Sequence, residues 1–126
     1  MKQQRFSIKA RFKSFVYAFN GLKILWQEEH NSRIHFVAVV LVTMVSFFLH
    51  LSFNEWVAVI LCFGFVISTE IINSSIENIA DFISPEKHDK IKKIKDLAAA
   101  AVLVAAITAV IVGILIFVPK IKILLC

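Results

Sequence analysis

The residues best suited to chemistry form a polar stripe inside an apolar part of the chain. At about 100° per residue, five polar side chains fall on one face of an α-helix: Glu70, Asn73, Ser74, Glu77 and Asp81. The stripe follows directly on the apolar run 57–69, so it lies at one end of a predicted membrane span. Carboxylates in that position are costly unless something pairs with them, and we therefore expect this face to be functional.

Two carboxylates a turn or two apart can ligate a hard divalent cation through oxygen. Mg²⁺ typically takes one or two carboxylates and completes its shell with water and substrate phosphates. Glu28 and Glu29 precede the first span and are expected at the same level as the stripe, while the Lys-rich segment 84–96 offers cations for phosphate oxygens. A metal, cations and a base suffice for phosphoryl transfer. With three glycines in the chain and neither a Walker A pattern nor a kinase Gly-rich loop, a nucleotide site would be unconventional.

The same residues fit other interpretations. Asn73, Ser74 and Ser75 suit hydrogen bonds between helices, and the charged run 86–96 suits a solvated loop that leads into a helix. The stripe also fits a small oligomeric ion or proton transporter, or an accessory subunit whose stripe pairs with a partner helix. Ion flux in liposomes without ATP consumption indicates the first, and ATP turnover by the purified protein excludes the second.

Composition places the protein in a membrane. The chain has 126 residues, enough for one domain; 59% of them are hydrophobic and the mean hydropathy is +0.79, against about 45–50% apolar residues in soluble domains. The net charge of +5 therefore indicates cytoplasmic loops and lipid headgroups as partners, with no nucleic acid. Cys62 and Cys126 show no disulfide or metal pattern, and His30 and His35 are expected to be interfacial polar residues.

The predicted fold is an all-α membrane protein in one domain. Region 1–33 is basic with a Phe-rich stripe and is predicted as an amphipathic surface helix, which Asn20-Gly21 could divide. Three transmembrane helices are predicted at 34–51, 56–83 and 97–118. We expect Ser84-Pro85 to end the second and Pro119 to close the third, with Glu55 solvated in the turn 52–55.

The basic residues predict the orientation. Seven Lys and Arg precede the first span, none lies in 52–55, five lie in 84–96 and two follow the third span. The positive-inside rule places the N-terminus and the 84–96 loop in the cytoplasm and the C-terminus outside. The acidic stripe is then expected at the cytoplasmic face.

Three motifs resemble the small bacterial integral-membrane lipid kinases, a family that comprises diacylglycerol kinase and undecaprenol kinase. The first is Glu70-Ile71-Ile72-Asn73-Ser74-Ser75-Ile76-Glu77 with Asp81, the second is Lys95-Asp96 before an Ala-rich span, and the third is Gly21-Leu22-Lys23 with Trp26 and Glu29. The similarity covers nearly the whole chain. It implies a homotrimer in the bacterial cytoplasmic membrane, with active sites shared between subunits and phosphoryl transfer from ATP with Mg²⁺.

The resemblance also implies roles for single residues. Glu70 would be the general base, supported by Asn73, and Glu29 and Glu77 would hold Mg²⁺. The nucleotide contacts would be Tyr17, Glu29, Glu77, Glu86, Lys87, His88, Lys95 and Asp96. The lipid contacts would be Lys23, Trp26, Arg33, Glu70 and Ala99.

Two departures concern substrate contacts. Ala10 stands where an arginine is expected near the nucleotide, although Arg11 is adjacent. Arg33-Ile34-His35 looks more like the undecaprenol branch, because the diacylglycerol branch is expected to carry an acidic residue in place of His35. The lipid therefore stays open between diacylglycerol and undecaprenol.

Overall fold

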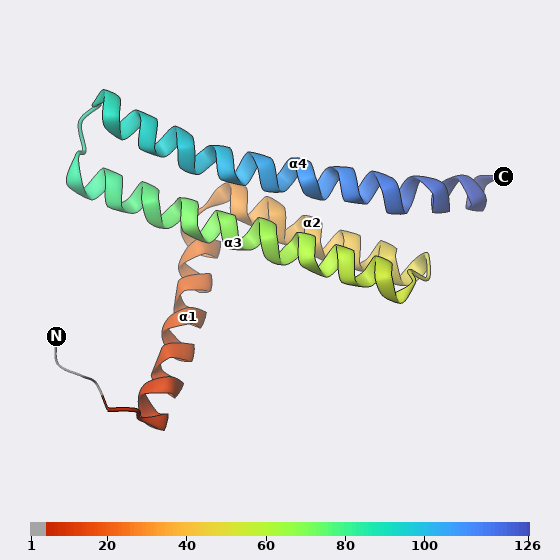
Figure 1. Ribbon diagram of the computed structural model, residues 1–126, viewed down its shortest axis with the longest axis horizontal. Coiled ribbons are helices and arrows are strands. Elements are labelled where there is room, and N and C mark those ends of the chain that lie inside the picture. The colour runs from red at the N-terminus through yellow and green to blue at the C-terminus, as the bar shows by residue number, and fades with distance from the viewer. Residues whose placement is uncertain (1–4) are drawn as a thin grey trace.

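The protein is described here by a computed structural model covering residues 5–126; residues 1–4, where the predicted surface region starts, lie outside it. The described chain forms four α-helices: α1 (Ile8–Glu28), α2 (His30–Phe48), α3 (Phe53–Ile83) and α4 (Asp89–Leu125). Helices α2, α3 and α4 run alongside one another, and α1 leaves them crosswise (Figure 1). Because α2, α3 and α4 are each long and apolar enough to span a membrane, the predicted all-α membrane class is confirmed.

Helix α1 is continuous. Its N-cap, Ser7, accepts a hydrogen bond from the Ala10 N–H at 3.4 Å. The break that we considered at Asn20-Gly21 does not occur, because a single glycine costs a helix only about 1 kcal/mol relative to alanine. Phe12, Phe15 and Phe19 are exposed, as an interfacial helix requires.

One residue, Glu29, separates α1 from α2, with an extended backbone at φ −108° and ψ 104°. The Arg33 guanidinium reaches back across this junction and donates to the carbonyl oxygens of Trp26 and Gln27, each at 2.5 Å. These carbonyls belong to the last turn of α1 and have no partner within the helix. The Trp26 ring also meets Phe36 of α2 edge-on, with centroids 5.7 Å apart. These contacts fix the direction in which α1 leaves.

Helix α2 ends at Phe48, three residues before the predicted boundary at Leu51, because the chain turns there. His50 has a φ of 52°, and the Leu51 N–H donates to the Ser46 carbonyl at 3.4 Å. This six-residue closure with a left-handed residue is a Schellman motif, in which glycine is the usual occupant.

We expect His50→Gly to raise the free energy of unfolding by up to about 1 kcal/mol. The left-handed conformation costs a non-glycine residue about 1–2 kcal/mol, and glycine's larger backbone entropy offsets part of the gain. Unfolding of the detergent-solubilised protein by SDS measures the change. His50→Ala keeps the Cβ atom and serves as the control; an equal gain in that variant would contradict strain as the cause.

Glu55 is not a solvated loop charge, as predicted, but part of α3. It forms a capping box with the N-cap Ser52, whose N–H donates to the Glu55 carboxylate at 3.0 Å, so α3 begins at Phe53 rather than at 56. The same carboxylate pairs with Lys120 of α4 at 3.1 Å, and each side chain is only 25% exposed. The prediction was wrong because the partner lies 65 residues further along the chain.

Helix α4 starts earlier and ends later than the predicted span 97–118. The expectation that Pro119 closes it is wrong: Pro119 lies inside the helix, which continues to Leu125. A proline removes one backbone hydrogen bond, but later residues still bond four residues back, as the Cys126 N–H does to Lys122 at 3.1 Å. Helix α3 ends at Ile83, directly before Ser84-Pro85, as predicted.

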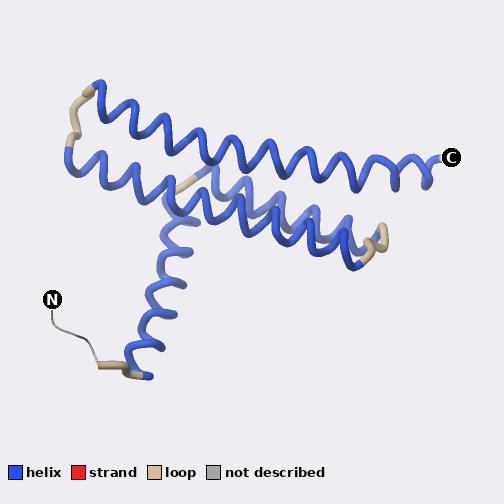
Figure 2. The backbone as a smooth tube through the Cα atoms, viewed as in Figure 1, coloured by secondary structure: helices blue, strands red, loops and turns tan. Residues whose placement is uncertain are grey.

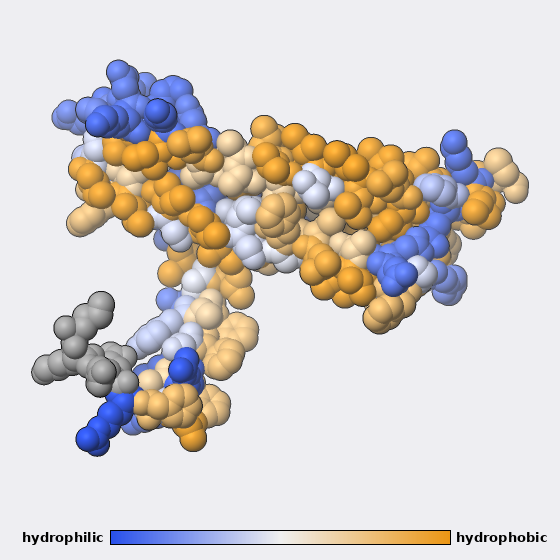
Figure 3. Space-filling model, viewed as in Figure 1, coloured by the Kyte–Doolittle hydropathy of each residue, from blue (hydrophilic) through white to orange (hydrophobic). Residues whose placement is uncertain are grey.

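Helices α3 and α4 pack against each other along most of their lengths (Figure 2). At 1.5 Å per residue they are about 46 and 55 Å long, so they exceed the ~30 Å hydrocarbon core of a bilayer. Apolar side chains cover the middle of the bundle, and hydrophilic ones gather at its ends (Figure 3). Little of this apolar surface is buried within one chain, which suits contact with lipid or with other subunits.

Candidate active site

Glu70 is buried in the middle of α3, with 4% of its surface exposed. One carboxylate oxygen lies 2.9 Å from His35 Nε2, and the other accepts a hydrogen bond from Ser32 Oγ at 3.3 Å. The two partners stand three residues apart on one face of α2. The acid that our sequence reading singled out is therefore paired on both oxygens, as a buried carboxylate requires.

The sequence reading missed both partners of Glu70. Ser32 received no role, and His35 was expected to be a polar residue at the interface. The sequence did offer one signal: Ser32 and His35 lie three residues apart at the start of an apolar span, so they form a polar face on α2 like the polar stripe on α3.

We call Glu29, Glu70 and Glu77 the acidic group, because the charges of Glu77 and Glu70 both act on the Glu29 carboxyl. Partial burial and the charge of Glu77, with smaller effects from Glu70 and Glu28, raise the pKa of Glu29. The nearby Ser74 hydroxyl acts in the opposite sense, although it makes no hydrogen bond of regular geometry. A bound cation would relieve the repulsion between these carboxylates, which is part of what raises the pKa.

Two buried oxygens on the polar face of α3, Asn73 Oδ1 and Ser74 Oγ, have no hydrogen-bond partner among the described residues. A cleft of about 190 Å³ lies between α1 and α3, lined in part by Glu29, Ser74 and Asn78. Within residues 5–126 no three His, Cys, Asp or Glu side chains come close enough to hold a metal by themselves. A cation here would thus have few protein ligands, which is usual for Mg²⁺.

A second cleft of about 440 Å³ lies where α3 turns into α4, and we call it the loop cleft. It brings together five of the eight predicted nucleotide contacts, namely Glu86, Lys87, His88, Lys95 and Asp96.

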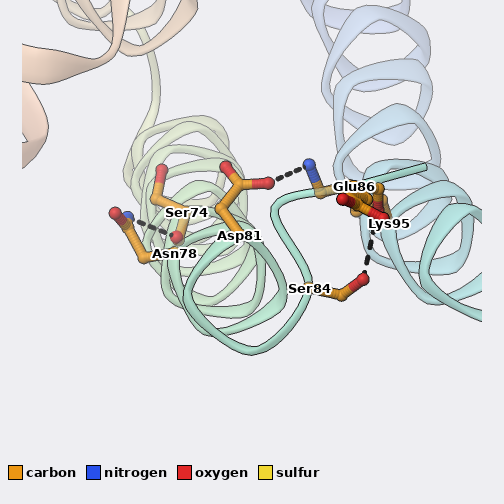
Figure 4. Close-up of polar contacts among 6 residues, drawn as sticks. All are labelled: Ser74, Asn78, Asp81, Ser84, Glu86 and Lys95. Carbon is orange, nitrogen blue, oxygen red and sulfur yellow. Dashed lines mark hydrogen bonds and ion pairs between the residues drawn. The ribbon is translucent and has the colours of Figure 1, made fainter. Parts of the chain in front are cut away.

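Four charged side chains of the loop cleft form two ion pairs. Lys95 pairs with Asp81 across the two helices (Figure 4), and Lys92 pairs with Asp96 at 2.6 Å. Lys95 is also within electrostatic reach of Glu77. The loop cleft therefore adjoins the acidic group.

Two side-chain hydrogen bonds stabilise the backbone of α3 beside the acidic group and of the turn at the loop cleft. The Asn78 side chain donates to the Ser74 carbonyl at 2.8 Å, and the Ser84 hydroxyl donates to the Glu86 carbonyl at 3.1 Å (Figure 4). The first keeps α3 regular beside the acidic group, and the second shapes the turn at the loop cleft.

The model of the family described as prokaryotic diacylglycerol kinase matches residues 16–117. The chain belongs to this family. Among relatives, it is 38% identical over 119 residues to the undecaprenol kinase of Bacillus subtilis, which covers 94% of this chain and 97% of that protein. It is 40% identical over 100 residues to the diacylglycerol kinase of Helicobacter pylori, covering 79% and 77%. It is 36% identical over 99 residues to that of Escherichia coli K12, covering 79% and 81%.

Membership in the prokaryotic diacylglycerol kinase family confirms the resemblance that the three motifs indicated. The matched segment contains Glu70, the rest of the acidic group and the whole loop cleft. Ala10, the departure at the predicted nucleotide contact, lies outside it on the exposed surface of α1.

Several residues to which the family resemblance gives roles lie away from both clefts within one chain. Tyr17 and Lys23 are exposed on α1, and Ala99 is exposed on α4. Trp26 packs on Phe36, and the Arg33 guanidinium is held by carbonyl oxygens at the α1–α2 junction. Within one chain the structure thus brings together the predicted base Glu70, the acidic group and most of the predicted nucleotide contacts, but not Tyr17 or the predicted lipid contacts other than Glu70.

Proposed function

We propose that this chain is a lipid kinase that transfers the γ-phosphoryl group of ATP, with Mg²⁺, to the hydroxyl of diacylglycerol or undecaprenol. The observation that carries the proposal is the buried Glu70 carboxylate, contacted on its two oxygens by His35 and Ser32, near Glu29, Glu77 and a cationic cleft. Family membership supports the same activity, since its named relatives are diacylglycerol and undecaprenol kinases.

In this proposal Glu70 accepts the proton of the lipid hydroxyl. A carboxylate offers about four lone-pair positions, and His35 and Ser32 occupy two of them, so positions remain for the incoming hydroxyl. Asn73, whose buried Oδ1 has no partner among the described residues, is placed one turn further along α3 to help orient the acceptor. A base within hydrogen-bond reach of its substrate is the geometric requirement for this step.

Glu29 and Glu77 fit the Mg²⁺ that would accompany ATP. They are two mutually repelling carboxylates with unpartnered oxygens nearby, the oxygen-rich and sparsely liganded set that Mg²⁺ prefers. When bound, the ion would neutralise charge on the phosphate oxygens.

The loop cleft supports nucleotide binding from the aqueous side. Lys87 and Lys95 would meet phosphate oxygens, and Lys95 would exchange its partner Asp81 for them. The distribution of basic residues favours a cytoplasmic N-terminus and a cytoplasmic loop cleft, in the cytoplasmic membrane of a bacterium. The lipid then reaches Glu70 laterally within the bilayer while ATP arrives from the cytoplasm.

A homotrimer with shared sites would account for the residues that one chain leaves apart. Tyr17, Lys23 and Ala99 reach neither cleft of their own chain, so a neighbouring subunit would bring them to a site. The wide exposed apolar surfaces of α2 and α4 are available for such contacts.

The deciding experiment is an assay of the purified protein in mixed micelles with radiolabelled ATP, with diacylglycerol and undecaprenol side by side. Phosphate transfer to either lipid supports the proposal and identifies the preferred acceptor. Ion flux in liposomes without ATP consumption, together with no lipid phosphorylation, would contradict it and favour the transporter.

Replacing Lys95 by Met is expected to raise the KM for ATP about tenfold or more, which corresponds to about 1.4 kcal/mol of lost binding. Lys95 lines the loop cleft and feels the charge of Glu77, so its loss should weaken phosphate binding at this cleft. Steady-state kinetics at saturating lipid measure the change. Lys93→Met is the matched control, because Lys93 is an exposed lysine of the same turn that does not line this cleft; an equal rise in both variants would contradict a specific contact.

A further inference from the structure

The two oxygens of the Glu70 carboxylate have separate partners, unlike those of a carboxylate in a single ion pair. Its two oxygens are held by two different side chains, and both come from one face of α2. Ser32 is fully buried, whereas the His35 side chain is 28% exposed. The exposed part of His35 borders an apolar groove of about 310 Å³ between α2, α3 and α4, lined by residues that include Val66 and Ala106. His35 therefore stands between the carboxylate and a space in the apolar layer.

We propose that His35 and Ser32 are positioning residues that fix the orientation of the Glu70 carboxylate for proton abstraction. The inference rests on the proposed role of Glu70 as the base. It adds to the site two residues of α2 to which neither the sequence reading nor the family resemblance gave this role.

The physical reason is the freedom of a glutamate side chain. A carboxylate on three rotatable bonds can turn its oxygens in many directions, and a displacement of about 1 Å can cost about a hundredfold in rate. Contacts on both oxygens, one from His35 and one from Ser32, remove that freedom, whereas a single contact would still let the carboxylate rotate. Since His35 and Ser32 stand on the same helix face, their spacing is fixed by α2 itself.

The test compares four variants of the full-length protein in the lipid kinase assay. We expect His35→Leu to lower kcat about tenfold to a hundredfold, the usual cost of losing an orienting partner, while the KM values for ATP and lipid stay unchanged. His35→Gln retains an N–H donor and should restore most of the rate. Ser32→Ala should also lower kcat. Ser46→Ala is the matched control, because Ser46 is an equally buried serine of α2 that donates to the Val42 carbonyl instead.

Two further results separate positioning from other roles. In a Glu70→Gln background, His35→Leu should reduce the residual rate no further, because a residue that acts through the base has no effect once the base is gone. A rise in the lipid KM alone, or an equal loss of rate in that background, would overturn the proposal. If His35→Leu does not fold, His35→Gln and Ser32→Ala decide the question. An unchanged kcat in Ser32→Ala, or a lost kcat in His35→Gln, would then contradict the proposal.

A measurement independent of catalysis tests the contact itself. The midpoints of thermal unfolding of His35→Leu, Glu70→Leu and the double variant should be non-additive, since either single change removes the same pair. Additive shifts would overturn the pairing. A wild-type protein with no lipid kinase activity would overturn the proposed function and this inference together, whereas full activity in His35→Leu would overturn this inference alone.

Discussion

Phosphate transfer to the lipid is expected to fall at least about a hundredfold in Glu70→Gln, because a general base contributes about 10² to 10⁴ in rate. Glutamine keeps the shape of the side chain: its amide oxygen can face His35 while its NH2 group donates to the Ser32 hydroxyl, which also accepts hydrogen bonds. It cannot take a proton at neutral pH. The fold should therefore persist while kcat falls and the KM for ATP changes little. Transfer of radiolabelled phosphate to lipid in detergent micelles measures the loss.

Glu55→Gln is the matched control for this variant. It makes the same change in the same helix, at the end of α3 opposite the loop cleft, where Glu55 pairs with Lys120. Losing this pair, which lies far from the loop cleft, should have little effect on stability and should leave turnover unchanged. Full activity in Glu70→Gln would remove Glu70 from the mechanism.

Glu77→Gln is expected to lower turnover by at least about a hundredfold, for a different reason. Glu77 is the member of the acidic group whose charge acts on both Glu29 and the loop-cleft residue Lys95. Its loss should weaken Mg²⁺ binding, and a metal ion contributes several kcal/mol of charge stabilisation in phosphoryl transfer. Raising the Mg²⁺ concentration should therefore restore part of the rate in this variant, and should restore none in Glu70→Gln.

The control for the metal is the neighbouring acid Glu28. It contributes less to the field at Glu29 than Glu77 does, and Glu28→Gln should leave the Mg²⁺ dependence close to that of the wild type. Chelation of Mg²⁺ should stop turnover of the wild-type protein. Undiminished turnover in excess chelator would remove the metal from the proposed mechanism.

Much of this architecture follows from local sequence. The uncharged runs predict α2, α3 and α4, and Ser84-Pro85 marks the end of α3, because hydrophobicity and backbone chemistry act on neighbouring residues. The stripe through Glu70 could be predicted for the same reason, since one helix has a known periodicity. The local signals failed at Pro119, where one lost hydrogen bond did not end a long helix.

The partners of these residues could not be predicted, because they depend on how one helix is placed against another. The sequence around Glu70 does not predict that it will contact His35 and Ser32, and the sequence around Glu55 does not predict its pairing with Lys120. The family resemblance implied a lipid contact for Arg33, but within one chain the Arg33 guanidinium donates to carbonyl oxygens of α1. Such pairings are set by the relative translation and rotation of packed helices, which one periodic pattern leaves undetermined.

The single-residue junction between α1 and α2 ties an acid of the proposed metal site to the surface of the bilayer. Glu29 is that junction, so the direction of α1 sets where its carboxylate lies relative to Glu77. A change in headgroup charge or bilayer thickness that tilts a surface helix would move this ligand directly. The bilayer would then affect catalysis in two ways: it supplies the lipid acceptor, and it sets the position of α1 and so of one proposed metal ligand, Glu29.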